Sequence, residues 1–397
     1  MGRTLFLFSA VYPYNLYGDN FLEREMDYLS KGFDKIVVIP YRKEIESPKA
    51  MPGNCTVLNP ILNSGIGFSL RGLFSFEGAK LLLPVLFKER ALSNSTKLKT
   101  WIKAYTFLNN LCNRKDIRKI GYQLSKNDVC YFYWGKWGNM LSVVWKGKAH
   151  FVSRFHGEWD LWEESSGNYT PLRDKVAAYL DFAAFISKKG ESYFNKKYQI
   201  KRTMFAPLGS IDMGISSKSK DGIVRVFTCS NVIPLKRVPL IFDCINSFSH
   251  NRQVVWTHIG GGDDLEPLRE KVEVEKENTL DVHLLGKKDH LEVIDYYKTH
   301  NIDLFINLST VEGVPVTIME AISCDVPVVA TDVGGVSEIV TDETGVLVSS
   351  NPSVEEVVAA IEKALIGEYH PRNFWQQHYN ADNNYSRFVK EIVNLTI

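Results

Sequence analysis

Residues 303–345 contain the pattern that most restricts what this chain can fold into. An apolar, strand-forming run at 303–308 leads into a polar loop. Pro315 then stands where a helix would begin, because the first helical position needs no N–H group. Apolar residues at helical spacing follow, up to Pro327, and a second apolar run leads to the turn Gly334-Gly335. This order of strand, loop, helix, strand and loop predicts a βαβ unit of an α/β sheet.

Two glutamates lie within this unit at positions that suit ligand binding. Glu312 falls in the loop after the first strand, and Glu320 falls about one turn inside the helix. Both can face the crevice above the sheet, where ligands of open α/β folds bind. The free N–H groups and the positive dipole of the helix start favour a phosphate, and carboxylates accept hydrogen bonds from sugar and ribose hydroxyls. The alternative is two solvated glutamates beside an ordinary helix.

The motif E-G-V-P-x-x-x-M-E-A, followed by P-V-V-A-T-D-V-G-G-x-x-E, resembles the donor-site signature of the GT-B glycosyltransferases of family 4. The resemblance covers most of residues 200–395 and extends only weakly into the earlier part. It implies an α/β fold of two Rossmann-like, doubly wound domains that face each other across a cleft. We expect an acceptor-binding domain at 1–207, a nucleotide-sugar-binding domain at 208–375, and a helix at 376–397 that returns to the first domain.

The resemblance also implies roles for individual residues of the second domain. Lys236 fits the place of a lysine on the donor pyrophosphate, and a cation there would stabilise the charge that develops as the glycosidic bond breaks. The place of a neighbouring arginine holds Asn231, so one cation is missing and Arg237 is expected to supply it. A chance Lys-Arg pair at a helix start is the alternative. The donor-binding residues that we expect are Gly18, Asn231, Arg237, Gly261, Gly286, Gly313, Val314, Pro315, Val316 and Glu320.

Three residues are expected to act in catalysis: Lys236, Glu312 and, from the first domain, His156. The histidine follows a predicted strand at 149–155, and the resemblance implies that it donates to hydroxyls of the donor sugar. The alternative is a turn histidine without a role. Gly18 matches a glycine-containing loop of the family only loosely, because the usual double glycine is absent. Since the family needs no bound metal for catalysis, we expect no metal and no cofactor.

The charge distribution indicates a second kind of partner. Residues 66–126 contain twelve Lys or Arg against three acidic residues, whereas the net charge of the whole chain is only +1. Apolar and aromatic residues alternate with these cations in a helical pattern, which suits an anionic membrane surface. A pair of core helices with a solvated basic face is the alternative. We expect no nucleic-acid partner, because no recognised binding motif accompanies the charge.

The cysteine pattern and hydropathy indicate a compartment. The six cysteines are scattered without a C-x-x-C pair, which argues for a reducing environment. The first residues resemble a buried strand rather than a signal peptide, and no stretch approaches about 20 uninterrupted apolar residues. We therefore expect a cytoplasmic protein, peripheral on the inner face of the plasma membrane.

The resemblance implies a retaining glycosyltransferase of the hexosyltransferase class. Its donor would be a nucleotide sugar, a UDP-sugar first and a GDP-sugar second. Its acceptor would be a hydroxyl of a lipid-linked oligosaccharide or growing surface polysaccharide. Two alternatives remain open. A nucleotide-sugar epimerase of GT-B fold would need an acid–base pair that the sequence does not reveal, and a non-catalytic nucleotide-sugar-binding partner of another transferase is consistent with Asn231.

Overall fold

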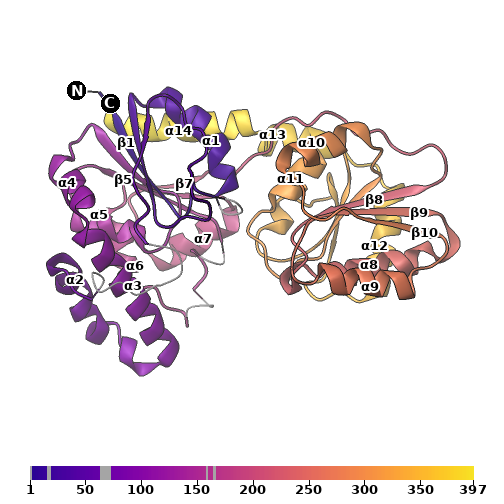
Figure 1. The fold of residues 1–397 in the computed structure, drawn as a ribbon, viewed down its shortest axis with the longest axis horizontal. Helices are drawn as coiled ribbons and strands as arrows, with labels where there is room; N and C mark the ends of the chain where they lie inside the picture. Colours follow the sequence, from indigo (N-terminus) through magenta and orange to yellow (C-terminus); the bar gives the residue numbers. More distant parts are fainter. Residues whose placement is uncertain (1, 16–18, 63–72, 158–159, 164–166) are drawn as a thin grey trace. The chain divides into compact units, whose positions relative to one another are not determined.

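The computed structural model describes residues 2–15, 19–62, 73–157, 160–163 and 167–397. Gly18 lies outside these residues. The chain forms two compact units, one of Met1–Ala206 with Tyr385–Ile397 and one of Pro207–Asn384. Each unit contains a parallel sheet with helices on both faces (Figure 1). This arrangement confirms the predicted α/β class with two Rossmann-like domains.

The described residues of the first unit form a seven-stranded sheet in the order β3-β2-β1-β4-β5-β6-β7, with every pair parallel. Its strands are buried on both faces, since Leu5 and Leu7 belong to one apolar cluster and Phe6 and Phe8 to another. The strand bounds are β1 (Thr4–Ser9), β2 (Lys35–Pro40), β3 (Cys55–Val57), β4 (Asp128–Phe132), β5 (His150–Phe155), β6 (Phe182–Phe185) and β7 (Thr203–Phe205).

Helices cover the two faces of this sheet unequally. Helix α1 and the last residues of α14 pack on one face, and most of the other helices contribute to the larger cluster on the opposite face. The helix bounds are α1 (Asn20–Gly32), α2 (Phe76–Lys88), α3 (Ser95–Asn113), α4 (Lys115–Gln123), α5 (Leu141–Val144), α6 (Arg173–Tyr179), α7 (Lys188–Lys197) and α14 (Ala381–Val393).

The second unit is a six-stranded parallel sheet in the order β10-β9-β8-β11-β12-β13. The strand order reverses between β8 and β11, which makes their carboxyl ends the topological switch point where ligands of open α/β sheets bind. The bounds are β8 (Val224–Cys229), β9 (Val254–Ile259), β10 (Leu280–Leu284), β11 (Leu304–Asn307), β12 (Val328–Thr331), β13 (Gly345–Val348), α8 (Val238–Phe248), α9 (Leu265–Glu275), α10 (His290–Thr299), α11 (Val316–Ser323), α12 (Val354–Ile366) and α13 (Pro371–His378).

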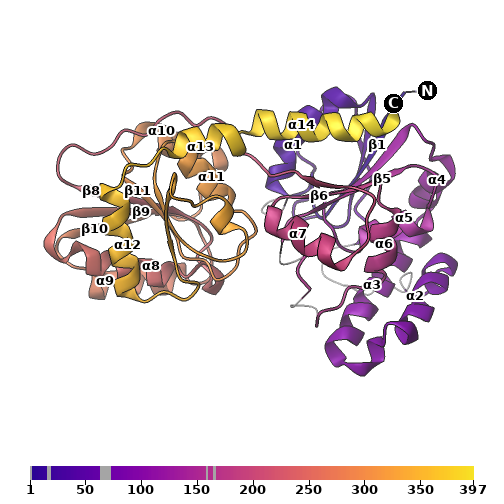
Figure 2. The same cartoon turned by 180° about the vertical axis from the view of Figure 1, so that it is seen from behind.

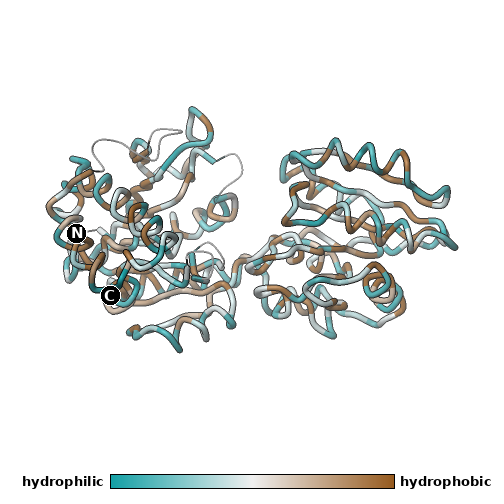
Figure 3. The backbone as a smooth tube through the Cα atoms, turned by 90° about the horizontal axis from the view of Figure 1, so that it is seen from below, coloured by the Kyte–Doolittle hydropathy of each residue, from teal (hydrophilic) through white to brown (hydrophobic). Residues whose placement is uncertain are grey.

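Hydropathy follows this layering in both units. Along the helices in Figure 3, apolar and polar residues alternate, as expected of amphipathic helices that pack one stripe on a sheet. Helices α8, α9 and α12 share an apolar cluster with the strands of the second sheet. Among the described residues, we find no helix whose length and hydropathy would allow it to span a bilayer.

The end of the chain returns to the first unit, but later than expected. Residues 376–384 belong to the second unit, and only the residues from Tyr385 onward belong to the first. There α14 lies alongside α1 (Figure 2), and Tyr385 contacts Tyr28 with ring centroids 5.8 Å apart. Phe388 is fully buried, and its ring centre lies 4.1 Å from the guanidinium carbon of Arg154.

This contact covers a buried ion pair. Arg154 on β5 donates to Glu25 on α1 over 2.6 Å, and neither side chain is exposed. Burial raises the pKa of the Glu25 carboxyl, although the Arg154 charge and a hydrogen bond with Tyr131 act in the opposite direction. A buried pair of this kind depends on the packing that excludes water from it. The end of α14 is therefore part of the first unit's core.

We predict that Phe388→Ala lowers the free energy of unfolding of the first unit by about 3–5 kcal/mol, because it leaves a cavity in a closed core. Lys390→Ala, an exposed position on the same helix, is the matched control and should change stability by less than about 0.5 kcal/mol. Urea denaturation followed by amide hydrogen exchange in β4 and β5 measures the difference. Equal protection in the two variants would contradict the role of α14.

Candidate functional site

Two of the predicted catalytic residues meet at the switch point of the second sheet. Lys236 ends the short 3₁₀ helix η5 (Pro234–Lys236) after β8, and Glu312 lies in the loop after β11. The Lys236 ammonium donates to Glu312 Oε1, although 76 positions separate the two residues in the chain. Ser309 Oγ donates to the same oxygen over 2.7 Å. The side chains are 21% and 12% exposed, so both remain accessible from the crevice.

Arg237 is engaged with backbone carbonyls. The backbone of Arg237 adopts a left-handed conformation, with φ of 50°, between η5 and α8. Its guanidinium donates to the carbonyls of Leu308 over 2.6 Å, Ser309 over 3.0 Å and Ser350 over 2.8 Å. Burial lowers the pKa of this guanidinium. Arg237 therefore holds the loop that leads to Glu312, and its contact with a phosphate stays a prediction.

Glu320 lies on the second turn of α11 and has a partner that the sequence analysis missed. Its Oε1 is 2.7 Å from Nε2 of His290, the first residue of α10. Glu320 is buried, whereas the His290 side chain is half exposed. The sequence did contain a signal: Asp289 and Glu292 form a capping box, which fixes the start of α10. The histidine is thereby directed to the carboxyl end of the sheet.

Helix α11 begins one residue later than predicted. Pro315 is its N-cap in an extended conformation, with φ of −68° and ψ of 124°, and Val316 is the first helical residue. The expected first-turn position of Pro315 is therefore wrong by one residue, because its backbone has not yet entered the helix. Gly313, Val314 and Val316 all lie at this start, as predicted from the motif. The N–H groups of the first turn have no carbonyl ahead of them within the helix.

A close backbone contact fixes the loop that carries Glu312. Gly335 N donates to Gly313 O over 2.8 Å. A Cβ atom on Gly334 would lie 1.8 Å from the carbonyl oxygen of Glu312, and Gly334 has a φ of 55°. The Gly-Gly turn is therefore required both for its conformation and for the space that it leaves.

The loops after β8, β9 and β10 are joined by backbone hydrogen bonds. Val232 N donates to Gly261 O and Gly260 N donates to Gly286 O, each over 2.9 Å. Gly261 and Gly286 thus lie at one end of the sheet, beside the exposed Asn231. The structure brings these predicted donor-binding residues into one group of loops at the carboxyl edge.

A buried histidine that sequence analysis missed supports this group of loops. Trp256 donates to Thr228 Oγ1, which is 2.8 Å from His258 Nδ1, and His258 Nε2 is 3.1 Å from Ser230 O. Burial lowers the pKa of His258 to about 4. The neutral ring therefore accepts from Thr228 and donates to Ser230, which ties β8 and β9 together beneath the crevice.

In the first unit, His156 follows β5 as predicted and is held by Asp160. The Oδ1 atom of Asp160 accepts from the backbone N–H groups of His156 and Gly157, each over 2.9 Å, and Oδ2 accepts from Gly135 N over 2.8 Å. Burial alone would raise the pKa of the Asp160 carboxyl. The nearby His156 and these N–H groups lower it by more, so that the pKa lies below its ordinary value. Among the described residues, His156 Nε2 is buried without a hydrogen-bond partner.

A second carboxylate joins the loops at the switch point of the first sheet, between β1 and β4. Asp19 Oδ2 accepts from the N–H groups of Val11 and Tyr12 over 2.7 and 3.0 Å. Its Oδ1 accepts from Trp134 Nε1 over 2.6 Å, and the Trp134 ring lies 4.4 Å from the His156 ring. Asp19 thus positions the Trp134 ring beside His156. The described residues contain no group of three His, Cys, Asp or Glu side chains that could hold a metal ion.

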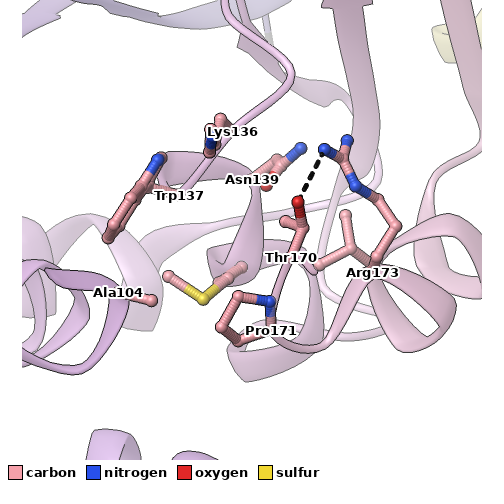
Figure 4. Close-up of a pocket in the computed structure, with 9 residues that line it drawn as sticks. Ala104, Lys136, Trp137, Asn139, Thr170, Pro171 and Arg173 are labelled. Carbon is pink, nitrogen blue, oxygen red and sulfur yellow. Dashed lines mark hydrogen bonds between the residues drawn. The ribbon is translucent and has the colours of Figure 1, made fainter. Parts of the chain in front are cut away.

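A small pocket lies between the loop after β4 and the start of α6 (Figure 4). Lys136, Trp137 and Asn139 come from the loop after β4, and Thr170, Pro171 and Arg173 come from the start of α6. Arg173 is buried and donates to Gly135 O over 2.8 Å and to Asp160 O over 2.7 Å. The pocket wall and the His156 turn are therefore parts of one hydrogen-bonded assembly.

Comparison with known proteins gives this arrangement a context. Residues 216–381 match the family model described as Glycosyl transferases group 1. The chain is 31% identical over 140 residues to the O-antigen biosynthesis glycosyltransferase WbnH of Escherichia coli, covering 34% of this chain and 37% of that protein. It is 40% identical over 75 residues to the lipopolysaccharide core biosynthesis mannosyltransferase LpsB of Rhizobium meliloti, covering 18% and 21%. The chain thus matches little more than a third of the length of WbnH and about a fifth of that of LpsB.

Solved structures share the fold over the whole chain. The apo form of the lipopolysaccharide outer core galactosyltransferase WaaB superposes with a TM-score of 0.68, 13% identity and coverage of 99% of this chain and 100% of that one. HepE of Anabaena in complex with UDP superposes with a TM-score of 0.64, 14% identity and the same coverage. These similarities confirm the GT-B fold that the sequence motifs predicted.

We predict that His258 makes the stability of the second unit depend on pH. The folded-state pKa of about 4 lies below the ordinary value near 6.5, so the unfolded state binds more protons between these values. The stabilisation is complete above about pH 6.5, and about 2 kcal/mol of it should be lost on acidification to pH 5. Hydrogen exchange of the β8 and β9 amides at pH 7 and pH 5 measures this loss. His258→Gln, which keeps a donor but does not titrate, should show a smaller decrease, and an unchanged pH dependence would contradict the assignment.

We also predict that Gly334→Ala displaces the Glu312 loop. The added Cβ would collide with the Glu312 carbonyl and strain the left-handed backbone, so stability should fall by more than about 1 kcal/mol. Gly222→Ala is the matched control, since Gly222 also has a positive φ but a Cβ there would meet no atom within 4 Å. Thermal melting of both variants separates strain from collision. Equal melting temperatures would show that the loop tolerates the Cβ.

Proposed function

We propose that this protein, whose residues 216–381 match the group 1 glycosyl transferases, moves a sugar from a nucleotide-sugar donor to an acceptor hydroxyl. The observation that carries the proposal is the Lys236–Glu312 pair at the switch point of the second sheet, beside the start of α11. This places one cation, one carboxylate and several backbone N–H groups within one crevice. A sugar diphosphate complements these groups, because its phosphate oxygens can bind the cation and the N–H groups and its hydroxyls can donate to the carboxylate.

Each residue has a distinct role in this proposal. Lys236 neutralises the pyrophosphate as the bond to the sugar breaks, and the first turn of α11 binds phosphate oxygens through N–H groups. In the structure Lys236 is paired with Glu312. When the donor binds, the pyrophosphate replaces Glu312 as the partner of Lys236, and Glu312 accepts from the sugar hydroxyls. Glu320, held beside His290, accepts from the ribose hydroxyls.

We propose further that the transfer retains the configuration of the sugar. The bond between the anomeric carbon and the diphosphate oxygen breaks, and a bond to the acceptor oxygen forms on the same face. The acceptor proton passes to the leaving diphosphate, so the step balances without a protein base. His156, whose buried Nε2 atom lacks a partner among the described residues, is suited to donate to a sugar hydroxyl.

The comparisons favour particular substrates. HepE, a protein with the same fold, was solved in complex with UDP, which favours a UDP-sugar here and leaves a GDP-sugar second. WbnH is named for O-antigen biosynthesis and LpsB for lipopolysaccharide core biosynthesis. We propose a lipid-linked or growing surface polysaccharide as the acceptor, presented at an anionic membrane surface.

One observation favours a second function. Asn231 stands where the family motif has a cation, and Arg237 donates to backbone carbonyls. A protein with a single cation at the pyrophosphate could bind the donor without transferring it. In that case the chain would be a non-catalytic partner of another transferase.

The prediction for this site is that Lys236→Met weakens donor binding at least about tenfold, because a charge-assisted contact to the diphosphate is lost. The measurement is a thermal-shift panel of UDP-, GDP-, ADP- and CMP-sugars, since a ligand at 100 times its dissociation constant adds about 2.7 kcal/mol of stability. Lys276→Met, an exposed lysine after α9 in the same unit, is the matched control and should respond as the parent does.

The outcomes of this panel separate the two functions. A responding sugar nucleotide that the parent transfers to an acceptor extract supports the enzyme. A responding donor without transfer would favour the non-catalytic partner. If Lys236→Met bound the donor as tightly as the parent, the assignment of the site would be wrong, and if no sugar nucleotide stabilised the parent, the proposed function would be rejected.

A further inference from the structure

An unusual concentration of exposed apolar side chains lies on α2 and its flanks. Phe76 and Phe87 are 70% and 69% exposed, although aromatic residues of this size are normally covered. In the part of the chain that the structure describes, six of the fourteen exposed large apolar side chains fall within 20 consecutive residues. We call these six residues the α2 surface: Leu73, Phe74, Phe76, Leu83, Phe87 and Leu92.

The helical part of this surface is a continuous stripe opposite the buried face of α2. Phe76, Lys80, Leu83 and Phe87 follow one another at intervals of four, three and four residues, which places them on one side of a helix. The opposite side contains buried residues such as Leu82, whose carbonyl accepts from Trp101 Nε1 on α3 over 2.9 Å. Packing on α3 therefore uses one face of α2, and Phe76, Leu83 and Phe87 on the other face are exposed.

The structure narrows the membrane-contact region that the sequence suggested at 66–126. The aromatic residues of α3, Trp101, Tyr105 and Phe107, belong to or pack against the apolar core of the first unit. Trp101 is buried, and Tyr105 and Phe107 are partly buried. Among the described residues of 66–126, the exposed large apolar side chains all belong to the α2 surface except Tyr122 on α4.

Charge surrounds the stripe. Lys80, Lys88 and Arg90 are exposed, and no ion pair within the described residues involves them. The Lys80 ammonium lies 5.9 Å from the centre of the Phe76 ring. These three cations outnumber the two carboxylates of the segment, the exposed Glu77 and the half-buried Glu89, and burial raises the pKa of the Glu89 carboxyl. An exposed apolar stripe with a cationic border is the pattern of a helix that lies in a lipid headgroup region.

We propose that the α2 surface inserts into the headgroup region of an anionic lipid bilayer, with α2 lying along the membrane plane. The apolar side chains enter the acyl boundary, and Lys80, Lys88 and Arg90 contact the anionic headgroups. The inference rests on the proposed function only in that a lipid-linked acceptor would be found at this surface. A second copy of the chain is disfavoured as the occupant, because a symmetric contact would bring like charges together.

The experiment uses the full chain with vesicles of phosphatidylcholine, with and without phosphatidylglycerol, in a flotation assay. We predict that Phe76→Ser/Phe87→Ser lowers binding to anionic vesicles at least about tenfold. The matched control is Val274→Ser/Ile366→Ser, which removes two side chains that are each 85% exposed on helices of the second unit. This control should bind as the parent does. Hydrogen exchange should show protection by vesicles at residues 73–92.

Each other outcome overturns the proposal. If the Phe76→Ser/Phe87→Ser variant bound anionic vesicles as the parent does, attachment would be purely electrostatic and located elsewhere. If the parent bound neither kind of vesicle, a lipid partner would be excluded. A concentration-dependent dimer of the parent that is absent in the Phe76→Ser/Phe87→Ser variant would show that a second copy of the chain covers the α2 surface. Thermal melting verifies that each variant folds. Because stabilisation by the donor is measured without vesicles, a failure here is distinguishable from a failure of the proposed function.

Discussion

The site depends on the reversal of strand order between β8 and β11. In a parallel sheet every strand ends at the same edge, and the connections on either side of a reversal lead away in opposite directions. The loops after β8 and β11 themselves stay in contact, since Thr310 N donates to Leu235 O over 2.9 Å and Arg237 donates to the carbonyls of Leu308 and Ser309. Lys236 and Glu312 meet there because each lies in the loop that follows one of these two strands. Neither the ion pair nor the start of α11 would be accessible if the two strands were joined by helices on the same side.

The two units stabilise their loops by different means. In the first unit, buried carboxylates collect backbone N–H groups: Asp160 joins the loops after β4 and β5, and Asp19 joins those after β1 and β4. In the second unit, close backbone contacts at glycines have the same effect, as at Gly334 against the Glu312 carbonyl.

Sequence reasoning reached the fold and part of the site for a physical reason. The alternation of strands and helices is a local pattern, and it predicted that Glu312 lies in a loop at the carboxyl end of a strand. The role of Lys236 was implied by the family resemblance, and its ion pair with Glu312 was not predicted. His290, His258 and Asp160 could not be identified in the same way. Their roles depend on partners in other loops and on burial, which the spacing of residues along the chain does not specify. Pro315 shows a third limit, because the N-cap and the first helical residue differ only in backbone conformation.

The position of α14 determines the order in which the units can be completed during synthesis. The second unit consists of residues 207–384. The first unit, although it contains the earlier part of the chain, needs Phe388, Val389 and Ile392 to close the cluster formed by β1, β4 and α1. Until those residues leave the ribosome, the Arg154–Glu25 pair lacks its cover. The unit that is translated first is therefore the one that finishes folding last, and until then its sheet retains an open apolar face.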